Sequence, residues 1–313
     1  MKKGTTAALA AAGLFGLSAL SGRYFYDLAI VRDSKFKIPE KKDPEKERAH
    51  AEFLQKVNDW MEKQPRQDCT ITSYDGLKLH AVYMPAYEPT KRTAILVHGY
   101  RASIANDFGE MLPFYRDSLK CNLLLVDDRG HNRSEGDYIG FGWHDHYDIE
   151  KWIDFLIEKH GSSAEIFLHG VSMGAAIVMI TAGGHLPPQV KGVIEDCGYT
   201  SIEGEMTYCM HSIYHLPIQP IFSEVNYFTQ KKAGYSLYDC DPKKAMAKTE
   251  LPFLLIHGGT DDFVPTYMVH ELFDACASSD KKKVIIQGAG HALSYHTNRE
   301  MYEQALLDFY GTH

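Results

Sequence analysis

The sequence predicts an α/β protein in which a mostly parallel, twisted sheet is covered by helices on both faces. Six short apolar runs recur along the chain, each followed by Gly or Asp and then by a segment of helical pattern. An alternating stretch at residues 69–86, interrupted by Asp75-Gly76, precedes them and is typical of an antiparallel hairpin. The 313 residues, of which 44% are hydrophobic, are enough for one large domain with a buried core.

The six apolar runs are continuous rather than alternating, which is the pattern of strands buried on both faces. The helical segments between them predict crossover connections that cover the sheet. We therefore predict parallel strands at residues 94–97, 123–126, 166–168, 193–194, 253–256 and 284–286.

The N-terminus has the pattern of a membrane segment. Lys2 and Lys3 precede an uncharged run at residues 4–22, and a helix of that length would span about 28 Å, close to the thickness of a bilayer core. Aromatic residues follow at 24–26, as they often do at a membrane interface. We predict a membrane anchor or signal segment at residues 1–26, with the domain that follows it extracytoplasmic, or secreted if the segment is cleaved.

The remaining chain divides into two parts. Residues 27–66 are predicted to be a linker followed by an amphipathic helix, whose apolar stripe packs on the domain or, alternatively, binds a partner. Residues 67–313 are predicted to be the main domain, which contains the sheet. The stripe consists of Phe53, Leu54, Val57, Trp60 and Met61.

Composition argues against several classes of function. The net charge of −8, without any basic block, argues against nucleic-acid binding. The six cysteines show no C-x-x-C spacing, so we expect buried free thiols rather than a metal or redox site. His144 and His146 have no third ligand at a convincing spacing, which argues against zinc. We predict no metal and no cofactor, and the sequence does not predict an oligomeric state.

A nucleophile elbow is predicted at Gly170-Val171-Ser172-Met173-Gly174. The apolar run at residues 165–169 precedes it, and a run of small and apolar residues follows at 175–182, which is the strand-turn-helix context of that motif. Gly170 and Gly174 permit the close approach of the strand and the helix around a strained serine.

A nucleophilic serine needs a base, and the base needs an orienting acid. His291 follows the predicted strand at 284–286 after two glycines, and this places it at a strand end. Asp261 and Asp262 follow the strand at 253–256, and Asp196 follows the strand at 193–194. Strand positions alone leave the choice among the three acids open.

Two further strings indicate a family. His257 to Pro265 reads H-G-G-T-D-D-F-V-P and resembles the H-G-x-x-D-x-x-V-P signature of α/β-hydrolases, which implies that Asp261 is the acid. Asp127 to Gly136 is similar to the D-x-R-G-x-G-x-S-x-G loop of esterases, lipases and prolyl-aminopeptidase-like enzymes. Asn132 replaces a usual glycine there, and asparagine tolerates left-handed backbone angles. The sequence thus resembles serine hydrolases of the α/β-hydrolase superfamily.

The same resemblance implies an oxyanion hole. Val97-His98-Gly99-Tyr100 resembles the H-G-x motif of the superfamily, which implies that the backbone N–H of Tyr100 acts with that of Met173. His98 is interpreted as a brace for the loop rather than as a base.

A cap is predicted at about residues 199–240. More than fifty residues separate the strand at 193–194 from that at 253–256, where a helix and two turns need about twenty-five. An insertion here would lie over the carboxyl ends of the strands, although ordinary helices that extend the core are an alternative. The aromatic residues predicted to bind substrate are Tyr199, Tyr208, Tyr214, Phe222 and Tyr227.

We therefore expect a serine hydrolase that cleaves carboxylic esters with apolar acyl or alcohol groups through an acyl-enzyme, with Ser172, Asp261 and His291 as the triad. The predicted substrate is a small-molecule ester, and the membrane is a partner through the N-terminal segment. A thioesterase, or an aminopeptidase that uses an acid of the cap, is the alternative. The available acids are Glu203, Glu205 and Glu224. A non-catalytic binding protein should lack a triad member, and none is missing.

Overall fold

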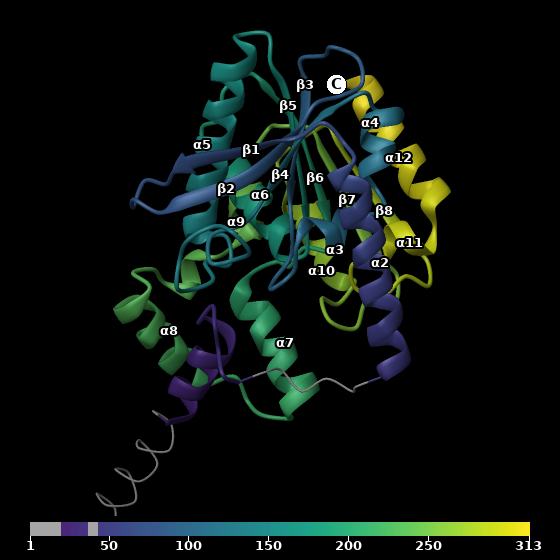
Figure 1. The fold of residues 1–313 in the computed structure, drawn as a ribbon. Helices are drawn as coiled ribbons and strands as arrows, with labels where there is room; N and C mark the ends of the chain where they lie inside the picture. The colour runs from purple at the N-terminus through teal and green to yellow at the C-terminus, as the bar shows by residue number, and fades with distance from the viewer. Residues whose placement is uncertain (1–19, 37–42) are drawn as a thin grey trace, which may run out of the picture.

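The central sheet has eight strands, and the computed structural model describes residues 20–36 and 43–313 around it (Figure 1). The strand order is β1-β2-β4-β3-β5-β6-β7-β8. The pairs β1–β2 and β2–β4 are antiparallel, and all other neighbours are parallel. The strands are β1 (Gln67–Thr72), β2 (Lys78–Met84), β3 (Arg92–Val97), β4 (Asn122–Val126), β5 (Glu165–Val171), β6 (Val190–Asp196), β7 (Phe253–Gly258) and β8 (Lys281–Ile286).

Each predicted strand is present, and the predicted fold class is confirmed. The hairpin turns at Gly76, whose φ of 89° explains why glycine follows Asp75 there. In the parallel part, Val97 pairs with Gly170, and Gly170 pairs with Glu195. The loops that follow β3, β5 and β6 therefore begin at the same level on one edge of the sheet.

Alternate residues of a strand face opposite sides of the sheet, so both faces carry apolar side chains. A layer of helices covers each face and encloses a hydrophobic core. One core contains Ile95 and Val97 of β3, and the other contains Ala94 and Leu96. Helices of the first layer are α5 (Trp143–His160), α6 (Met173–Ala182), α9 (Pro242–Met246) and α10 (Tyr267–Ala275). Helices of the second are α3 (Ile104–Phe108), α4 (Leu112–Asp117), α11 (Ser294–Thr297) and α12 (Arg299–Thr312), with α2 (Pro44–Glu62) packed outside α3.

The segment between β6 and β7 stands apart from the two layers. It contains α7 (Ile202–Tyr214), α8 (Ile221–Lys232) and the short 3₁₀ helix η1 (Leu237–Asp239), and Figure 1 shows α7 and α8 below the sheet. This segment covers the range predicted to be a cap, and we call residues 199–240 the cap below.

The described part of the N-terminal region packs on the cap. Residues 20–29 are helical and lie beside α7 and α8 (Figure 1). The Phe25 ring meets Tyr214 edge-on at 5.2 Å between centroids, and Tyr26 is 96% buried. Residues 20–26 of the predicted anchor and the start of the predicted linker therefore belong to the folded body. We name residues 20–32 the N-terminal strap.

Most of the predicted membrane segment, residues 1–19, lies outside the described residues, so the anchor stays a prediction. Across the described ranges, no helix is both long and apolar enough to cross a bilayer. The predicted amphipathic helix corresponds to α2. Pro44 is its first residue, and the Asp43 side chain caps it by accepting hydrogen bonds from two backbone N–H groups.

Candidate active site

Ser172 occupies a sharp turn between β5 and α6. Its φ of 57° and ψ of −116° are strained for a residue with a side chain. A Cβ added to Gly170 would lie 2.1 Å from the carbonyl oxygen of Gly174, and one added to Gly174 would lie 2.0 Å from that of Val97. Only glycine fits at both positions, because the strand and the helix touch there through their backbones.

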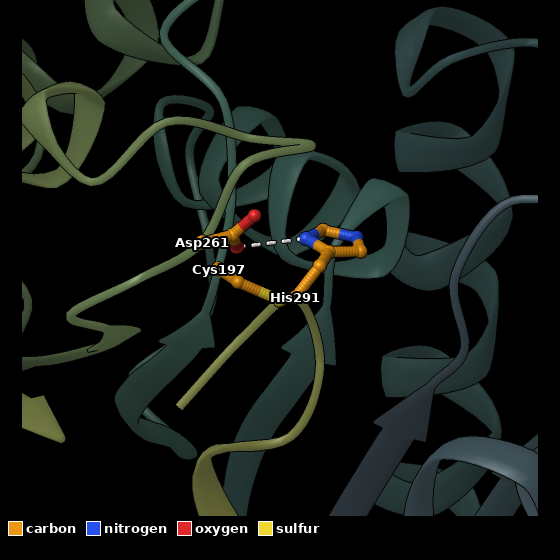
Figure 2. Close-up of side chains that lie close together, drawn as sticks. All are labelled: Cys197, Asp261 and His291. Carbon is orange, nitrogen blue, oxygen red and sulfur yellow. Dashed lines mark hydrogen bonds and ion pairs between the residues drawn. The ribbon is translucent and has the colours of Figure 1, made fainter. Parts of the chain in front are cut away.

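Three loops bring Ser172, His291 and Asp261 together. The Ser172 Oγ lies 2.9 Å from Nε2 of His291, and Nδ1 of His291 lies 2.8 Å from Oδ2 of Asp261. Figure 2 shows the Asp261 carboxylate facing the His291 ring. The serine follows β5, the aspartate follows β7 and the histidine follows β8. This arrangement can move a proton from the serine hydroxyl to a histidine held by a carboxylate.

The Asp261 carboxylate is fully buried and well supplied with donors. Its Oδ1 accepts hydrogen bonds from the backbone N–H groups of Phe263 (3.0 Å) and Val264 (2.9 Å). Burial would raise the pKa of Asp261, but hydrogen bonds from His257 and His291 outweigh that effect and lower the pKa to about 2. The group is therefore ionised throughout the neutral range and can orient His291.

The two other acids lie in different surroundings. Asp262 is exposed, and its backbone carbonyl accepts a hydrogen bond from the Tyr208 hydroxyl. The Asp196 carboxylate accepts hydrogen bonds from Ser294 (3.2 Å) and Tyr302 (3.0 Å). Neither carboxylate is hydrogen-bonded to His291, which leaves Asp261 as the described acid that holds the imidazole.

The loop after β3 lies directly against the nucleophile. A Cβ added to Gly99 would be 3.3 Å from the Cβ of Ser172. The Gly99 N–H is already used, because it donates a 2.6 Å hydrogen bond to Oδ2 of Asp107. Among the described residues, the N–H groups of Tyr100 and Met173 donate to no protein acceptor. They are therefore free to receive a developing negative charge near Ser172.

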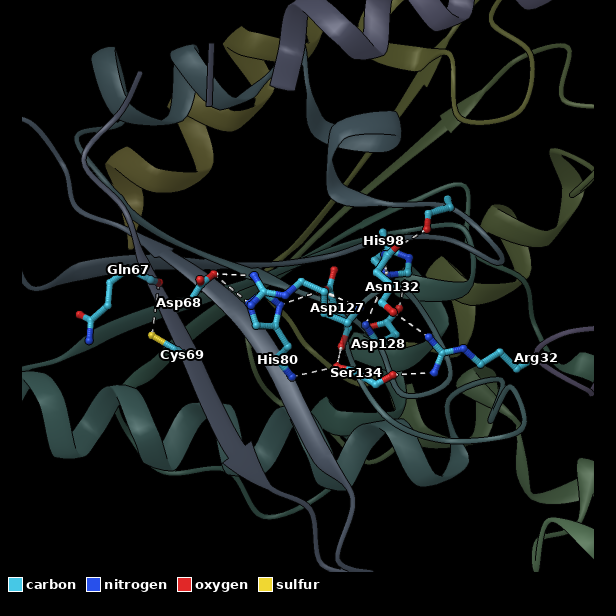
Figure 3. Close-up of polar contacts among 12 residues, drawn as sticks. Arg32, Gln67, Asp68, Cys69, His80, His98, Asp127, Asp128, Asn132 and Ser134 are labelled. Atoms are coloured by element: carbon cyan, nitrogen blue, oxygen red, sulfur yellow. Dashed lines mark hydrogen bonds and ion pairs between the residues drawn. The ribbon is translucent and has the colours of Figure 1, made fainter. Parts of the chain in front are cut away.

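His98 braces this loop. Its Nδ1–H donates to the carbonyl oxygen of Gly99 (2.9 Å), and its Nε2 accepts from the N–H of Asp128 (3.3 Å). Burial, aided by nearby His131, lowers the pKa of His98 to about 3, so the ring is neutral and can accept that bond. Figure 3 shows His98 beside Asn132, whose φ of 43° is the left-handed conformation expected where asparagine replaces glycine.

An apolar pocket of about 130 Å³ begins at Ser172 and extends under the cap. Of the aromatic residues predicted to bind substrate, Tyr199, Tyr214 and Phe222 line it. Tyr208 and Tyr227 do not line it, and the Tyr227 side chain is 54% exposed. Three residues of the strap complete the wall, namely Phe25, Leu28 and Ala29.

Glu205 is the acid of this pocket. It is 94% buried, its Oε1 accepts a 3.1 Å hydrogen bond from the Cys209 thiol, and its Oε2 has no partner among the described residues. Burial raises the pKa of Glu205 to about 7. An unpaired carboxyl in apolar surroundings is a polar anchor for a ligand. Of the other two acids named for the cap, Glu203 and Glu224, neither lines the pocket.

One set of potential metal ligands overlaps the site. The ligand atoms of Cys197, Asp261 and His291 lie within 4.8 Å of one another (Figure 2). Burial raises the pKa of the Cys197 thiol well above its usual value, so it is protonated and a poor metal ligand. Asp261 and His291 are already hydrogen-bonded to each other. These donors do not fit a resident metal, and all six cysteines are free.

The two histidines considered for zinc are also engaged elsewhere. His144 Nδ1 pairs with the Tyr74 hydroxyl, and its Nε2 contacts the carbonyl oxygen of Ala233 at 3.2 Å. Nδ1 of His146 donates to the carbonyl oxygen of Gly142. These contacts fix the start of α5 on the hairpin and the cap.

The sheet order, the elbow and the convergence of loops at one sheet edge define the chain as an α/β-hydrolase. Residues 140–313, more than half of the chain, match the prolyl oligopeptidase family, and the protein belongs to that family.

Curated relatives and solved structures agree with this class. The chain is 29% identical over 227 residues to the uncharacterized protein YqkD of Bacillus subtilis, covering 72% of this chain and 73% of that one. It is 26% identical over 266 residues to human monoglyceride lipase, covering 73% and 85%. An esterase of Pyrococcus furiosus superposes with a TM-score of 0.65 at 17% identity, covering 82% of this chain and 93% of that one. This structural likeness shows the common fold.

Proposed function

We propose that the protein is a serine hydrolase of carboxylic esters that carry an apolar acyl or alcohol group. The observation that carries this proposal is the 2.9 Å contact between Ser172 Oγ and His291 Nε2 at the end of an apolar pocket. The similarity to monoglyceride lipase supports an ester substrate, as does the fold shared with esterases.

The reaction follows from the hydrogen bonds of the site. The Ser172 Oγ attacks the ester carbonyl carbon while His291 Nε2 takes the serine proton. Asp261 accepts the Nδ1–H bond and stabilises the imidazolium that forms. The N–H groups of Tyr100 and Met173 receive the negative charge of the tetrahedral intermediate. His291 then gives its proton to the departing alkoxide, which leaves an acyl group on Ser172.

Water completes the cycle. His291 Nε2 removes a proton from a water molecule, and the resulting hydroxide attacks the acyl carbon. Collapse of the second tetrahedral intermediate returns the proton to Ser172 Oγ and releases the acid. Each step uses groups of this chain and a water molecule.

The pocket favours apolar substituents because, in its described lining, the buried polar side-chain atoms without a partner are only the Tyr214 hydroxyl and Oε2 of Glu205. The Tyr199 hydroxyl donates to the carbonyl oxygen of Phe141, and that of Tyr100 donates to Ala29. An alkyl chain placed there gains roughly 0.8 kcal/mol for each buried methylene.

Glu205 favours a second candidate, an aminopeptidase or aminoacyl esterase. The unpartnered Oε2 could pair with a substrate ammonium, and a charge-assisted hydrogen bond of that kind is stronger than a neutral one. The pocket holds one such acid among largely apolar walls, so we rank this candidate below the ester hydrolase.

Covalent labelling tests the nucleophile. A fluorophosphonate probe should label the wild-type protein and should not label Ser172→Ala, and Ser172→Ala should lower the kcat for nitrophenyl esters by up to roughly 10⁶-fold. Absence of labelling of folded wild-type protein would overturn the serine-hydrolase proposal. Retention of more than a tenth of the activity by Ser172→Ala would show that another residue is the nucleophile.

A matched pair of esters separates the two candidates. L-Leucine nitrophenyl ester and 4-methylpentanoate nitrophenyl ester differ only in the amine. The ester-hydrolase proposal predicts that the enzyme prefers the amine-free ester and that Glu205→Gln changes the ratio less than threefold. The amine-binding candidate predicts the opposite preference and a loss of at least tenfold in Glu205→Gln.

A further inference from the structure

We infer that the N-terminal strap, residues 20–32, is a wall of the acyl pocket and limits the length of acyl chain that the enzyme accepts. The inference rests on the proposed ester hydrolysis at Ser172. Phe25, Leu28 and Ala29 line the same cavity as Ser172, although they lie far from it in sequence. The ligand class that fits this wall is an aliphatic acyl group, because the three side chains offer it only hydrocarbon.

The strap is packed against the cap through buried side chains. Leu28 is 96% buried and Ile30 is fully buried. Phe25 meets Tyr214 of α7, and Tyr26 lies 6.0 Å from the Phe228 ring of α8. These contacts hold the strap beside both cap helices (Figure 1), and three of its side chains line the pocket together with residues of α7 and α8.

The loop that carries the predicted oxyanion donor clamps the backbone of the strap. The Arg101 guanidinium donates hydrogen bonds to the carbonyl oxygens of Leu28 (3.1 Å), Val31 (2.7 Å) and Arg32 (3.0 Å). The Tyr100 hydroxyl donates to the carbonyl oxygen of Ala29 at 3.0 Å. These donors fix the position of Leu28 and Ala29 relative to the loop beside Ser172.

The strap is held on its other side by Arg32. Its guanidinium donates to the carbonyl oxygens of Ser134 (2.7 Å) and Asn132 (2.7 Å), and Figure 3 shows it directed at both residues. The N–H of Ile139 donates a 2.8 Å hydrogen bond to the carbonyl oxygen of Ile30. Because both clamps bind backbone carbonyls, substitution of the lining side chains leaves them in place.

A fixed wall predicts that the enzyme accepts acyl chains only up to a certain length. For each methylene that the pocket buries, kcat/KM should rise about fourfold, and the rise should stop where the chain meets the strap. Phe25→Ala opens the wall and should move the optimum to longer acyl chains. Leu28→Trp fills the pocket and should move it to shorter chains.

The experiment measures kcat/KM for nitrophenyl esters from acetate to dodecanoate with full-length wild type and both variants. We expect the ratio of decanoate to butyrate to rise at least fivefold in Phe25→Ala and to fall at least fivefold in Leu28→Trp. Lys35→Ala is the matched control, because this side chain is exposed just beyond the strap, and its ratio should equal that of the wild type. Thermal unfolding verifies that each variant is folded, and Phe25→Ala suffices if Leu28→Trp fails to fold.

Two outcomes are distinguishable. Ratios within twofold of the wild type in the folded variants, with normal fluorophosphonate labelling, would overturn the strap inference and leave the proposed function standing. Absence of labelling in the wild type would overturn the proposed function, and the strap inference with it.

Discussion

Replacing Glu205 by glutamine removes the charge of one buried group and leaves its volume almost unchanged. The carboxyl lies in the apolar pocket, and its Oε2 has no partner among the described residues. Burial raises its pKa from the usual 4.5 to about 7. Ionisation of Glu205 therefore destabilises the folded protein at neutral and alkaline pH.

The size and sign of the effect on stability follow from the difference in the pKa of Glu205 between the folded and the unfolded protein. The folded protein binds the Glu205 proton more tightly than the unfolded chain does, so stability falls as pH rises from 4.5 to about 7 and is level above that. At about 1.4 kcal/mol for each pH unit, the cost at pH 8 is about 3 kcal/mol. The free energy of unfolding of Glu205→Gln, relative to that of the wild type, should therefore be higher at pH 8 than below pH 4.5 by up to about 3 kcal/mol.

Urea denaturation at pH 5, 6, 7 and 8 measures this difference. The buried amide of the variant has its own constant cost, so the informative quantity is how the wild-type-to-variant difference changes with pH. Glu203→Gln is the matched control, because Glu203 lies on the same turn of α7 and does not line the pocket. The change with pH of the Glu205→Gln difference is compared with the change measured for this control. A pH-independent difference for Glu205→Gln would refute the reasoning.

Three further predictions concern the site and its clamps. Asp261→Asn should leave the fold intact and lower kcat for nitrophenyl esters by about 10⁴-fold, because an amide can hold the wrong histidine tautomer; a loss under tenfold would contradict this. Gly174→Ala should destabilise the protein by at least about 3 kcal/mol in urea because its Cβ would meet Val97, whereas Gly311→Ala, in open space on α12, should be neutral or stabilising. Arg32→Ala should release the strap and flatten the acyl-length profile, and an unchanged profile would show that the strap keeps its position without this clamp.

Local patterns predicted much of the architecture. The continuous apolar runs identified the parallel strands, and the Asp75-Gly76 pair identified the hairpin, because backbone angles and burial on both faces restrict residue choice position by position. The elbow was visible for the same reason, since the backbone contacts at Gly170 and Gly174 admit no side chain. The choice of Asp261 among three acids came from family resemblance rather than from these patterns.

The residues that line the pocket could not be predicted from such patterns. Tyr208 and Tyr227 were grouped with Tyr199, Tyr214 and Phe222 by composition, yet only the last three line the cavity. Helical spacing says which residues share a face, but it does not say which face meets the pocket when two helices pack over a sheet. Glu205 was one of the three acids named for the predicted cap, and its burial in the pocket that Ser172 also lines distinguishes it from the other two.

The sequence by itself determined the sheet, the positions of Ser172 and His291 at strand ends, and the glycines that allow the elbow, because each depends on neighbours within a few residues or on the order of the strands along the chain. Only the tertiary structure decided that the strap, residues 20–32, contributes side chains to the pocket. An apolar N-terminal segment has the same composition whether it meets lipid or protein. The arginine clamps that place it join backbone carbonyls, which leave no pattern in the sequence.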